Sequence, residues 1–114
     1  MRHLKKKKLG KGTDHRRKLL RALASSAILY ERITTSYANA RGVRPYLEKI
    51  ITRAKEDSLH NRRIILSALS KNAAKKVLEV YGPKYKDRKG GYLRLTKLNN
   101  PKAGKSKVLV EFVE

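Results

Sequence analysis

The residues best suited to chemistry in this sequence are positively charged, and they are densest in the first twenty-one positions. Met1 to Arg21 contains ten Lys or Arg and one acid, Asp14. Ammonium and guanidinium groups bind phosphate oxygens, so this stretch suits a nucleic-acid partner. Residues 1–12 include two glycines and too little apolar surface to offset the entropy lost on ordering. We predict a flexible basic arm that becomes ordered only against a phosphate-rich surface.

The charge of the whole chain favours the same kind of partner. Thirty Lys and Arg against nine Asp and Glu give a formal net charge of +21. Self-repulsion of this size opposes a compact state, and a polyanion would relieve it. The alternative is a solvated tail kept for solubility, but acidic residues serve that purpose better than basic ones.

Catalytic and metal-binding patterns are weak in this sequence. The nine acids are scattered and only Glu56 and Asp57 are adjacent, whereas a metal-dependent nuclease needs several converging carboxylates. His3, His15 and His60 are far apart and none has a partner at ligand spacing, so His3 and His15 are interpreted as RNA contacts. The chain has no Cys, which excludes disulfides and thiolate-bound metal. We expect no enzyme, no cofactor, no metal and no small-molecule substrate.

Targeting and membrane signals are also missing from the sequence pattern. The four lysines at 5–8 are followed by Leu-Gly-Lys-Gly rather than by the apolar run of a secretory signal. No window approaches the roughly 18 apolar residues of a membrane span. We therefore expect a soluble intracellular protein with no membrane partner.

The first element expected to position the charges is a helix from Asp14 to about Leu29, capped by Thr13. Its apolar face comprises Leu19, Leu20, Leu23, Ala24, Ala27 and Tyr30. Its opposite face presents Arg17, Lys18 and Arg21. This helix would pack inward and extend the basic surface of the arm.

A strand and a second helix are expected next. Arg32 to Ser36 is rich in β-branched residues and too short for a helix. Helical spacing returns at Tyr37, but Pro45 removes one backbone hydrogen bond, so the regular helix is expected from Pro45 to about Lys55, with a start near Tyr37 left open. The expected inner face consists of Ala40, Val43, Leu47, Ile50, Ile51 and Ala54.

Two more helices are predicted between residues 58 and 82. Ser58 would cap the first, Leu59 to Leu69, which presents one apolar side and one polar side. The apolar side carries Leu59, Ile65, Leu66 and Leu69, and the polar side carries Asn61, Arg62 and Arg63. Asn72 would cap the second, whose inward residues are Ala74, Val77, Leu78 and Tyr81. Gly82 followed by Pro83 predicts its end, with Gly82 as a left-handed cap.

A basic loop and a hairpin complete the pattern. Lys84 to Gly91 is followed by two expected strands, Tyr92 to Leu98 and Val108 to Val113, which form an antiparallel pair. Tyr85 and Tyr92 lie among basic residues, where a ring could stack on an unpaired base. For Tyr92, packing on the sheet is an equal alternative. Tyr30, Tyr46 and Tyr81 are interpreted as core or boundary residues.

Several stretches of this sequence resemble the bacterial large-subunit ribosomal protein seventeen family. The matching stretches are Met1-Arg2-His3, Leu9, His15-Arg16, Glu31-Arg32-Ile33-Thr34-Thr35, Arg44-Pro45-Tyr46-Leu47-Glu48, Leu59-His60-Asn61-Arg62-Arg63, Gly82-Pro83-Lys84-Tyr85, Asp87-Arg88-Lys89-Gly90-Gly91-Tyr92-Leu93-Arg94-Leu95 and Val110-Glu111-Phe112-Val113-Glu114. They occur in order along nearly the whole chain.

The resemblance implies an α+β fold and a ribosomal role. The fold would be a two-layer body, residues 13–114, in the order α-β-α-α-α-β-β, with a small mixed three-stranded sheet and the arm, residues 1–12, attached. The partners would be large-subunit ribosomal RNA and neighbouring ribosomal proteins, in the ribosome of the cytoplasm.

The predicted RNA-binding residues come from the residue pattern and the family motifs together. They are Arg2, His3, Lys5, Lys6, Lys7, Lys8, Lys11, His15, Arg16, Arg17, Lys18, Arg21, Arg62, Arg63, Lys84, Tyr85, Arg88, Lys89, Tyr92 and Arg94. Two alternatives stay open: a DNA-compacting protein, which would need a dimerising apolar seam, and an RNA-processing nuclease, which would need an acidic cluster. Neither feature is visible in the sequence.

Overall fold

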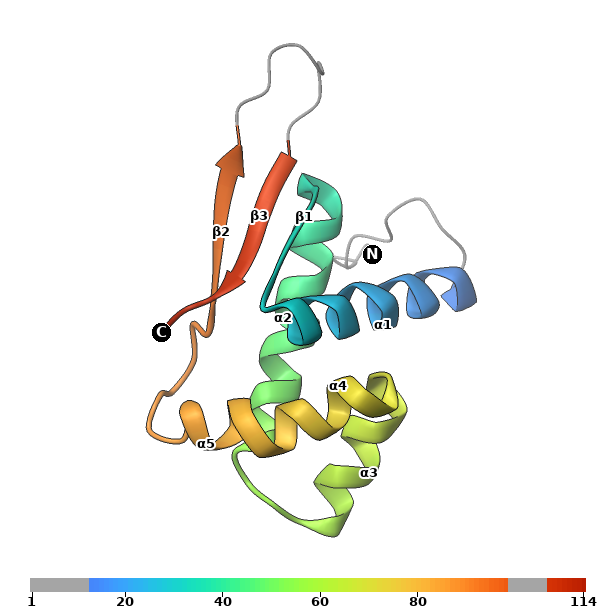
Figure 1. The fold of residues 1–114 in the computed structure, drawn as a ribbon. Coiled ribbons are helices and arrows are strands. Elements are labelled where there is room, and N and C mark those ends of the chain that lie inside the picture. Colours follow the sequence, from blue (N-terminus) through green and yellow to red (C-terminus); the bar gives the residue numbers. More distant parts are fainter. Residues whose placement is uncertain (1–12, 99–106) are drawn as a thin grey trace, which may run out of the picture.

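The computed structural model describes residues 13–98 and 107–114 of the chain (Figure 1). Within them the elements are α1 (Thr13–Tyr30), β1 (Arg32–Ser36), α2 (Tyr37–Ala54), α3 (Leu59–Ala68), α4 (Lys71–Lys76), the π-helical turn η1 (Val77–Tyr81), α5 (Gly82–Lys84), β2 (Leu93–Leu98) and β3 (Lys107–Phe112). Because α4, η1 and α5 follow one another without a break, the order agrees with the predicted α-β-α-α-α-β-β. The predicted arm and most of the loop between the last two strands lie outside the described residues.

The three strands form one sheet in the order β1-β3-β2. β3 is central and pairs antiparallel with both neighbours, with Leu109 opposite Thr34 on one side and Thr96 on the other. The α+β class is confirmed, but the mixed sheet is wrong. β2 and β3 form a hairpin, which makes them antiparallel, and β1 adds to the free edge of β3 in the direction of β2.

The helices cover one face of this sheet and leave the other face open (Figure 1). Val108 and Val110 point to the helical side and are buried, whereas Thr34 and Thr96 on the other face are exposed. This alternation is the period-2 pattern of a sheet buried on one side. Long helix α2 runs between the sheet and the other helices, so both layers share one core.

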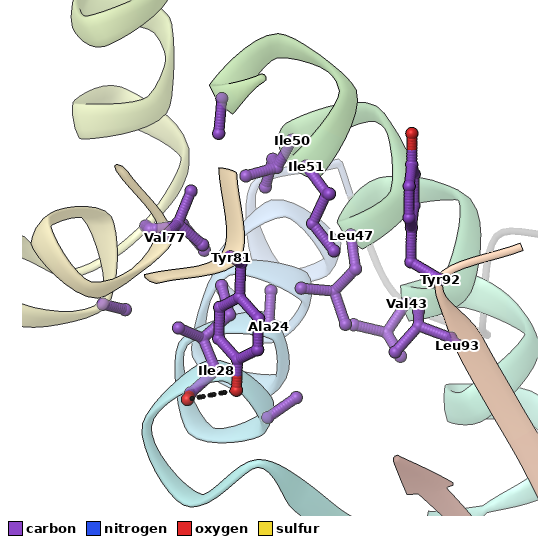
Figure 2. Packing of buried hydrophobic residues seen from close by; sticks show 14 of the residues in the cluster. Ala24, Ile28, Val43, Leu47, Ile50, Ile51, Val77, Tyr81, Tyr92 and Leu93 are labelled. Atoms are coloured by element: carbon purple, nitrogen blue, oxygen red, sulfur yellow. Dashed lines mark hydrogen bonds between the residues drawn. The ribbon is translucent and has the colours of Figure 1, made fainter. Parts of the chain in front are cut away.

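The core is centred on α2 and on the ring of Tyr81 (Figure 2). The predicted inner face of α2 is confirmed, because Ala40, Val43, Leu47, Ile50, Ile51 and Ala54 are all buried. Tyr81 lies near Ile28 of α1, and its hydroxyl donates a hydrogen bond to the Ile28 carbonyl at 3.3 Å. The ring of Phe112 stacks on Tyr81 with the centroids 4.4 Å apart, which connects the sheet to this cluster.

Helix α2 begins at Tyr37, so the expectation of a regular start at Pro45 is wrong. Ser36 caps the helix, and its hydroxyl accepts a hydrogen bond from the backbone N–H of Asn39 at 3.2 Å. Pro45 and the residue whose carbonyl it leaves unbonded, Arg41, are both exposed. Water can therefore solvate the carbonyl, and the helix tolerates the proline.

The segment from α4 to α5 differs from prediction at both ends. Its cap is Ser70 rather than Asn72, with the Ser70 hydroxyl accepting from the Ala73 N–H at 3.4 Å. Gly82 has a right-handed φ of −56°, and its N–H bonds to the Val77 carbonyl across the wide η1 turn. The helical path consequently continues through Pro83 instead of stopping.

Gly82 serves a close approach between two helices. A Cβ atom at this position would lie 2.6 Å from the carbonyl oxygen of Ala54, at the end of α2. That distance is below any ordinary contact, so only a glycine fits here. The predicted left-handed cap is wrong, and the glycine instead lets η1 and α5 pack on α2.

Four side-chain orientations also differ from prediction. Tyr30 is 72% exposed and so is not a core residue, and Leu59 and Leu66 of α3 face the solvent as well. Asn61, expected on the polar outer side, is buried. Its amide donates to the Glu56 carbonyl at 2.9 Å and accepts from the Arg53 guanidinium at 3.1 Å, so its polar groups are satisfied at the α2–α3 turn.

Candidate nucleic-acid interface

Five predicted RNA-binding residues lie on α1. His15, Arg17, Lys18 and Arg21 are exposed, and Arg16 is half-buried. The inner side of the same helix holds Ala24, Ala27 and Ile28 in the core. Helix α1 therefore presents a basic outer surface and an apolar inner one, as predicted. The arm residues Arg2, His3, Lys5, Lys6, Lys7, Lys8 and Lys11 lie outside the described residues.

Helix α1 runs beside α4 and in the same direction (Figure 1). The Arg21 guanidinium donates to the Leu69 carbonyl at 2.9 Å, and the Ser25 hydroxyl accepts from the Ser70 N–H at 2.9 Å. These two bonds hold the start of α4 against the middle of α1. The exposed basic residue Lys71 at the start of α4 therefore extends the basic surface of α1.

Two further basic residues, Lys71 and Lys75, are exposed on α4 and were not among the predicted RNA-binding residues. Their positive charge is visible in the sequence, but no local pattern reveals that α4 lies alongside α1. The contact depends on Arg21 and Ser25, which are 48 and 45 residues from their partners. Only the tertiary structure brings the two basic helices together.

Four of the nine acids form ion pairs, and the cations that pair with them lie outside α1. All nine lie at described positions. Among the described residues the ion pairs are Arg44–Glu48, Arg62–Asp57, Lys76–Glu31 and Arg94–Glu111. None of these pairs includes a basic residue of α1. The cations on the outer side of α1 are consequently available to an external anion.

Arg62 and Arg63 of α3 differ in their availability. The Arg62 guanidinium makes two hydrogen bonds to the Asp57 carboxylate, at 2.6 and 2.8 Å. The hydrogen bond from Arg62 lowers the pKa of Asp57, and the same contact raises the pKa of Arg62. Arg63 is exposed and makes no ion pair with the described acids. Of the two, Arg63 is therefore the better phosphate ligand.

The tyrosines expected to stack on bases are core residues. Tyr85 is 2% exposed and Tyr92 is 0% exposed, so neither ring offers a face to a base. The stacking hypothesis is wrong for both, and for Tyr92 the alternative of packing on the body is confirmed. Their rings lie against each other with centroids 5.2 Å apart. Tyr85 lies in the basic loop and Tyr92 directly follows it, so the fold buries a ring near each end of the loop.

These rings hold the basic loop on the body. The Tyr92 hydroxyl lies 2.9 Å from the Lys55 ammonium and 3.2 Å from the Thr52 hydroxyl. Burial alone would raise the pKa of Tyr92, but the hydrogen bonds with Lys55 and Thr52 outweigh it, and the pKa is lowered. Lys55 also donates to the Arg88 carbonyl, and the Tyr85 hydroxyl donates to the Val113 carbonyl. The loop thereby presents its cations from a fixed backbone.

Lys84, Arg88 and Lys89 on this loop are exposed. Lys55, which fastens the loop, was not predicted to do so because it lies 33 residues before Arg88. In Figure 1 the loop that follows α5 and the first turn of α1 lie on opposite sides of the molecule. The predicted residues therefore form separate basic surfaces, one on α1 and α4 and one on this loop.

Arg94 lies on the open face of the sheet. Its guanidinium is 3.6 Å from the carboxylate of Glu111 on the neighbouring strand β3. Arg32 of β1 is the other cross-strand neighbour of Glu111. Glu111 thus lies between two arginines, and this part of the surface is closer to neutral than α1.

Residues 13–98 and 107–114 contain no group of three or more His, Cys, Asp or Glu side chains arranged to hold a metal ion. None of the helices they form has the length and apolar character needed to cross a membrane.

The family model that matches this chain and the relatives described below belong to one family. Residues 19–113 match the family described as ribosomal protein L17. A Large ribosomal subunit protein bL17 from Hydrogenobaculum sp. is 43% identical over 118 residues, covering 100% of both chains. The protein of the same name from Wolbachia pipientis subsp. Culex pipiens is 47% identical over 106 residues, covering 90% of this chain and 75% of the relative. The protein of the same name from Thermoanaerobacter sp. is 45% identical over 105 residues, covering 91% of this chain and 93% of the relative.

Proposed function

Because the chain belongs to the ribosomal protein L17 family, we propose that it binds large-subunit ribosomal RNA through a basic arm and through basic surfaces of its folded body. As a member of this family it is a structural constituent of the large ribosomal subunit, in the ribosome of the cytoplasm, and not an enzyme. Ribosomal RNA and other ribosomal proteins are its partners at this coarse level. The finer proposal concerns which residues contact RNA.

The observation that carries the proposal is the uncompensated charge on α1. His15, Arg17 and Lys18 are exposed, and no described ion pair involves them. Arg16 and Arg21 add two guanidinium groups to the same helix, and Lys71 and Lys75 continue the surface on α4. Cations arranged in this way neutralise phosphates and release counterions, which favours binding without reading sequence.

Residues 1–12 extend this surface in the proposal. They contribute Arg2, His3, Lys5, Lys6, Lys7, Lys8 and Lys11, immediately before the first turn of α1. We assign them as an RNA-binding arm joined to a single folded domain, residues 13–114. The domain would fix the place where the arm enters the RNA, and ordering of the arm would be coupled to binding.

The loop and α3 would supply additional contacts. Lys84, Arg88 and Lys89 project from a fastened loop, and Arg63 projects from α3. Arg62 and Arg94 are assigned weaker contacts, because Asp57 and Glu111 already neutralise part of their charge. Since these groups face different directions, the protein would contact more than one RNA segment.

Deletion of residues 1–12 tests how much of the RNA affinity comes from the arm and how much from the folded body. The truncated chain is expected to keep the far-ultraviolet circular dichroism of the full chain and to bind a large-subunit RNA fragment at least a hundredfold more weakly, because several phosphate contacts are lost. Binding is measured by filter retention at several salt concentrations. Equal affinity of the two forms would contradict the role of the arm.

Salt dependence provides a second measurement on the same samples. If about six to ten phosphates are neutralised, the logarithm of the association constant should fall with the logarithm of salt concentration at a slope near −4 to −9. A slope flatter than about −2 would indicate that most of the charge is merely solvated. Sedimentation with the large subunit after a high-salt wash is the corresponding test in a cell lysate.

A further inference from the structure

A tyrosine outside the predicted sites carries two cations on an exposed ring. Tyr37 begins α2 and is 41% exposed. The Arg41 guanidinium lies 5.6 Å from the centroid of its ring, and the Lys97 ammonium lies 5.5 Å from it. Arg41 comes from the next turn of α2 and Lys97 comes from β2. Two separate elements therefore bring positive charge to one aromatic ring.

Tyr37 differs from every other ring that carries a cation in the described part of the chain. The rings of Tyr81, Tyr85 and Tyr92 each have one lysine over them, and all three are buried. Those contacts lie at the edge of the core, where they add to packing. Tyr37 has two cations, and part of its surface faces the solvent. Packing alone does not account for this arrangement.

Lys97 lies on the side of β2 that faces the helices, at the end of the strand that is outside the core. Leu93, Leu95 and Lys97 alternate with outward residues along the strand, and exposure increases from Leu93 to Lys97. Lys97 is opposite Val108 on β3. The strand therefore directs the ammonium group towards the start of α2, where Tyr37 lies.

The charge at this end of the molecule has no internal counterpart. None of the ion pairs among the described residues includes Arg41 or Lys97. Like charges gathered without an acid repel one another, and a bound anion would relieve the repulsion.

We propose that Tyr37, Arg41 and Lys97 bind one unpaired nucleotide of RNA. Its phosphate would draw the two cations away from the ring, and the ring surface that they leave would stack on its base. Stacking requires a base whose face is free, so the ligand is a single-stranded segment rather than a duplex. This assignment rests on the proposed RNA binding and adds to it a contact on α2 and β2, away from α1 and from the Lys84–Gly91 loop.

Tyr37 also arranges the two cations before binding. Contact with the ring restricts the long side chains of Arg41 and Lys97, so less conformational entropy is lost when a phosphate arrives. Removal of the ring should therefore weaken binding both by losing the stacking and by freeing the cations. Tyr37→Phe keeps the ring and is expected to bind like the unmodified chain.

The test uses the full chain and a fluorescent single-stranded RNA of eight nucleotides, followed by fluorescence anisotropy. Tyr37→Ala is expected to weaken binding about tenfold, which is within the range for loss of one stacked base. Lys97→Gln is expected to flatten the slope of log affinity against log salt by about 0.7, the value for one phosphate of a single strand. A duplex of the same length should be less affected by Tyr37→Ala than the single strand is.

Two matched controls are available in the chain. Tyr30→Ala removes a tyrosine that is also exposed but has no described cation over its ring. Lys49→Gln removes the same charge as Lys97→Gln from an exposed position on α2. Both are expected to bind the single strand like the unmodified chain, apart from a small change due to net charge.

The outcomes separate this contact from the general RNA-binding proposal. If the full chain binds RNA and Arg17→Ala with Lys18→Ala weakens it, but Tyr37→Ala and Lys97→Gln do not, the Tyr37 contact is overturned alone. If the full chain binds no RNA, the proposed function fails first. If Tyr37→Ala loses its circular dichroism signal, this variant has not folded. The salt slope of Lys97→Gln then decides whether the contact exists. Binding of poly(glutamate) is measured as well. If Tyr37→Ala weakens it as much as it weakens RNA binding, the site would suit an acidic protein partner, and the assignment to a nucleotide would be overturned.

Discussion

The Arg21 guanidinium donates a hydrogen bond to the carbonyl of Leu69 at 2.9 Å. The same residue lies on the exposed basic side of α1, so one arginine of the proposed RNA surface also joins α1 to the end of α3. Arg17 and Lys18, one turn earlier, have no such described contact. Arg21 is therefore expected to contribute to both RNA binding and stability, whereas Arg17 and Lys18 are expected to contribute to binding alone.

Substitution of Arg21 should therefore affect both properties. Arg21→Ala is expected to lower the free energy of unfolding by about 1 kcal/mol, the usual net value of one hydrogen bond. Arg17→Ala together with Lys18→Ala should leave the unfolding midpoint in urea unchanged and flatten the salt slope of RNA binding by about 1.5. Urea titrations and filter binding check the two effects. An unchanged stability of Arg21→Ala would mean that the Leu69 contact contributes nothing in solution.

Gly82, the first residue of α5, should be the least replaceable of the described glycines. Gly82→Ala puts a methyl group 2.6 Å from the Ala54 carbonyl oxygen, and both atoms belong to rigid helices. We expect a loss of roughly 1–3 kcal/mol in the free energy of unfolding, as for overpacked cores.

Gly90→Ala is the control for this substitution, because a Cβ there meets nothing within 4 Å. Its unfolding midpoint should match that of the unmodified chain. A Gly82→Ala protein of normal stability would show that α5 can move away from α2.

The fastening of the basic loop should be visible in hydrogen exchange. Lys55→Met removes the donor to the Arg88 carbonyl and the ammonium beside the Tyr92 hydroxyl. Amides in residues 84–91 are expected to exchange at least several-fold faster, while those in α1 keep their protection. Mass spectrometry of peptic fragments gives both values. Lys49→Met, on the same helix, should change neither.

Alkaline pH should destabilise the fold through Tyr81. Burial, with further contributions from Glu31 and Tyr85, raises the pKa of Tyr81 above its ordinary value of 10.0. In the folded state the hydroxyl keeps its proton at a pH where the unfolded chain has lost it. Its stabilising effect is complete below about pH 10 and is lost as pH rises from there towards the folded pKa.

Tyr81→Phe isolates this effect from general alkaline damage. The variant loses the hydrogen bond to the Ile28 carbonyl, which should cost about 1 kcal/mol at neutral pH. Its free energy of unfolding should then fall less steeply than that of the unmodified chain above pH 10. Urea titrations between pH 8 and 11 measure the slopes, and parallel curves would contradict the assignment to Tyr81.

Periodicity in the sequence predicted most of the fold. β1 has the predicted bounds of Arg32–Ser36, and the six inner residues of α2 are all buried. Alternating and helical patterns record burial directly, because each side chain's environment follows from its place in the repeat. The same logic located the basic side of α1.

Local stop signals were less reliable than periodicity. Pro45 and the Gly82-Pro83 pair both lie inside continuous helical segments. In each case the tertiary surroundings determine whether the helix continues. The carbonyl of exposed Arg41 can be solvated by water, so the helix tolerates Pro45, and Gly82 continues the helical path because it packs closely on Ala54. Asn61 is buried for a similar reason, since its partners on α2 and in the turn cannot be inferred from its own helix.

The sequence predicted which residues of the candidate site are charged, but not which of them lie close together in the fold. The cations of α1 and of the loop after α5 were visible, whereas the proximity of α4 to α1 depends on distant residues. Tyr85 and Tyr92 look like binding residues because their neighbours in sequence are basic, yet the fold buries both rings. Tyr37 was overlooked because Lys97, one of its two cations, is 60 positions away.

The central place of β3 has a consequence for the order of folding. β1 and β2 do not pair with each other, and each depends on β3, which is synthesised after every other described element. During translation the helical layer can collapse early, because α1, α2 and α4 precede β3, whereas the sheet must wait for residues 107–112 to leave the exit tunnel. The three-stranded sheet therefore cannot form before residues 107–112 have been synthesised, and a chain truncated before that strand would retain two unpaired strand segments.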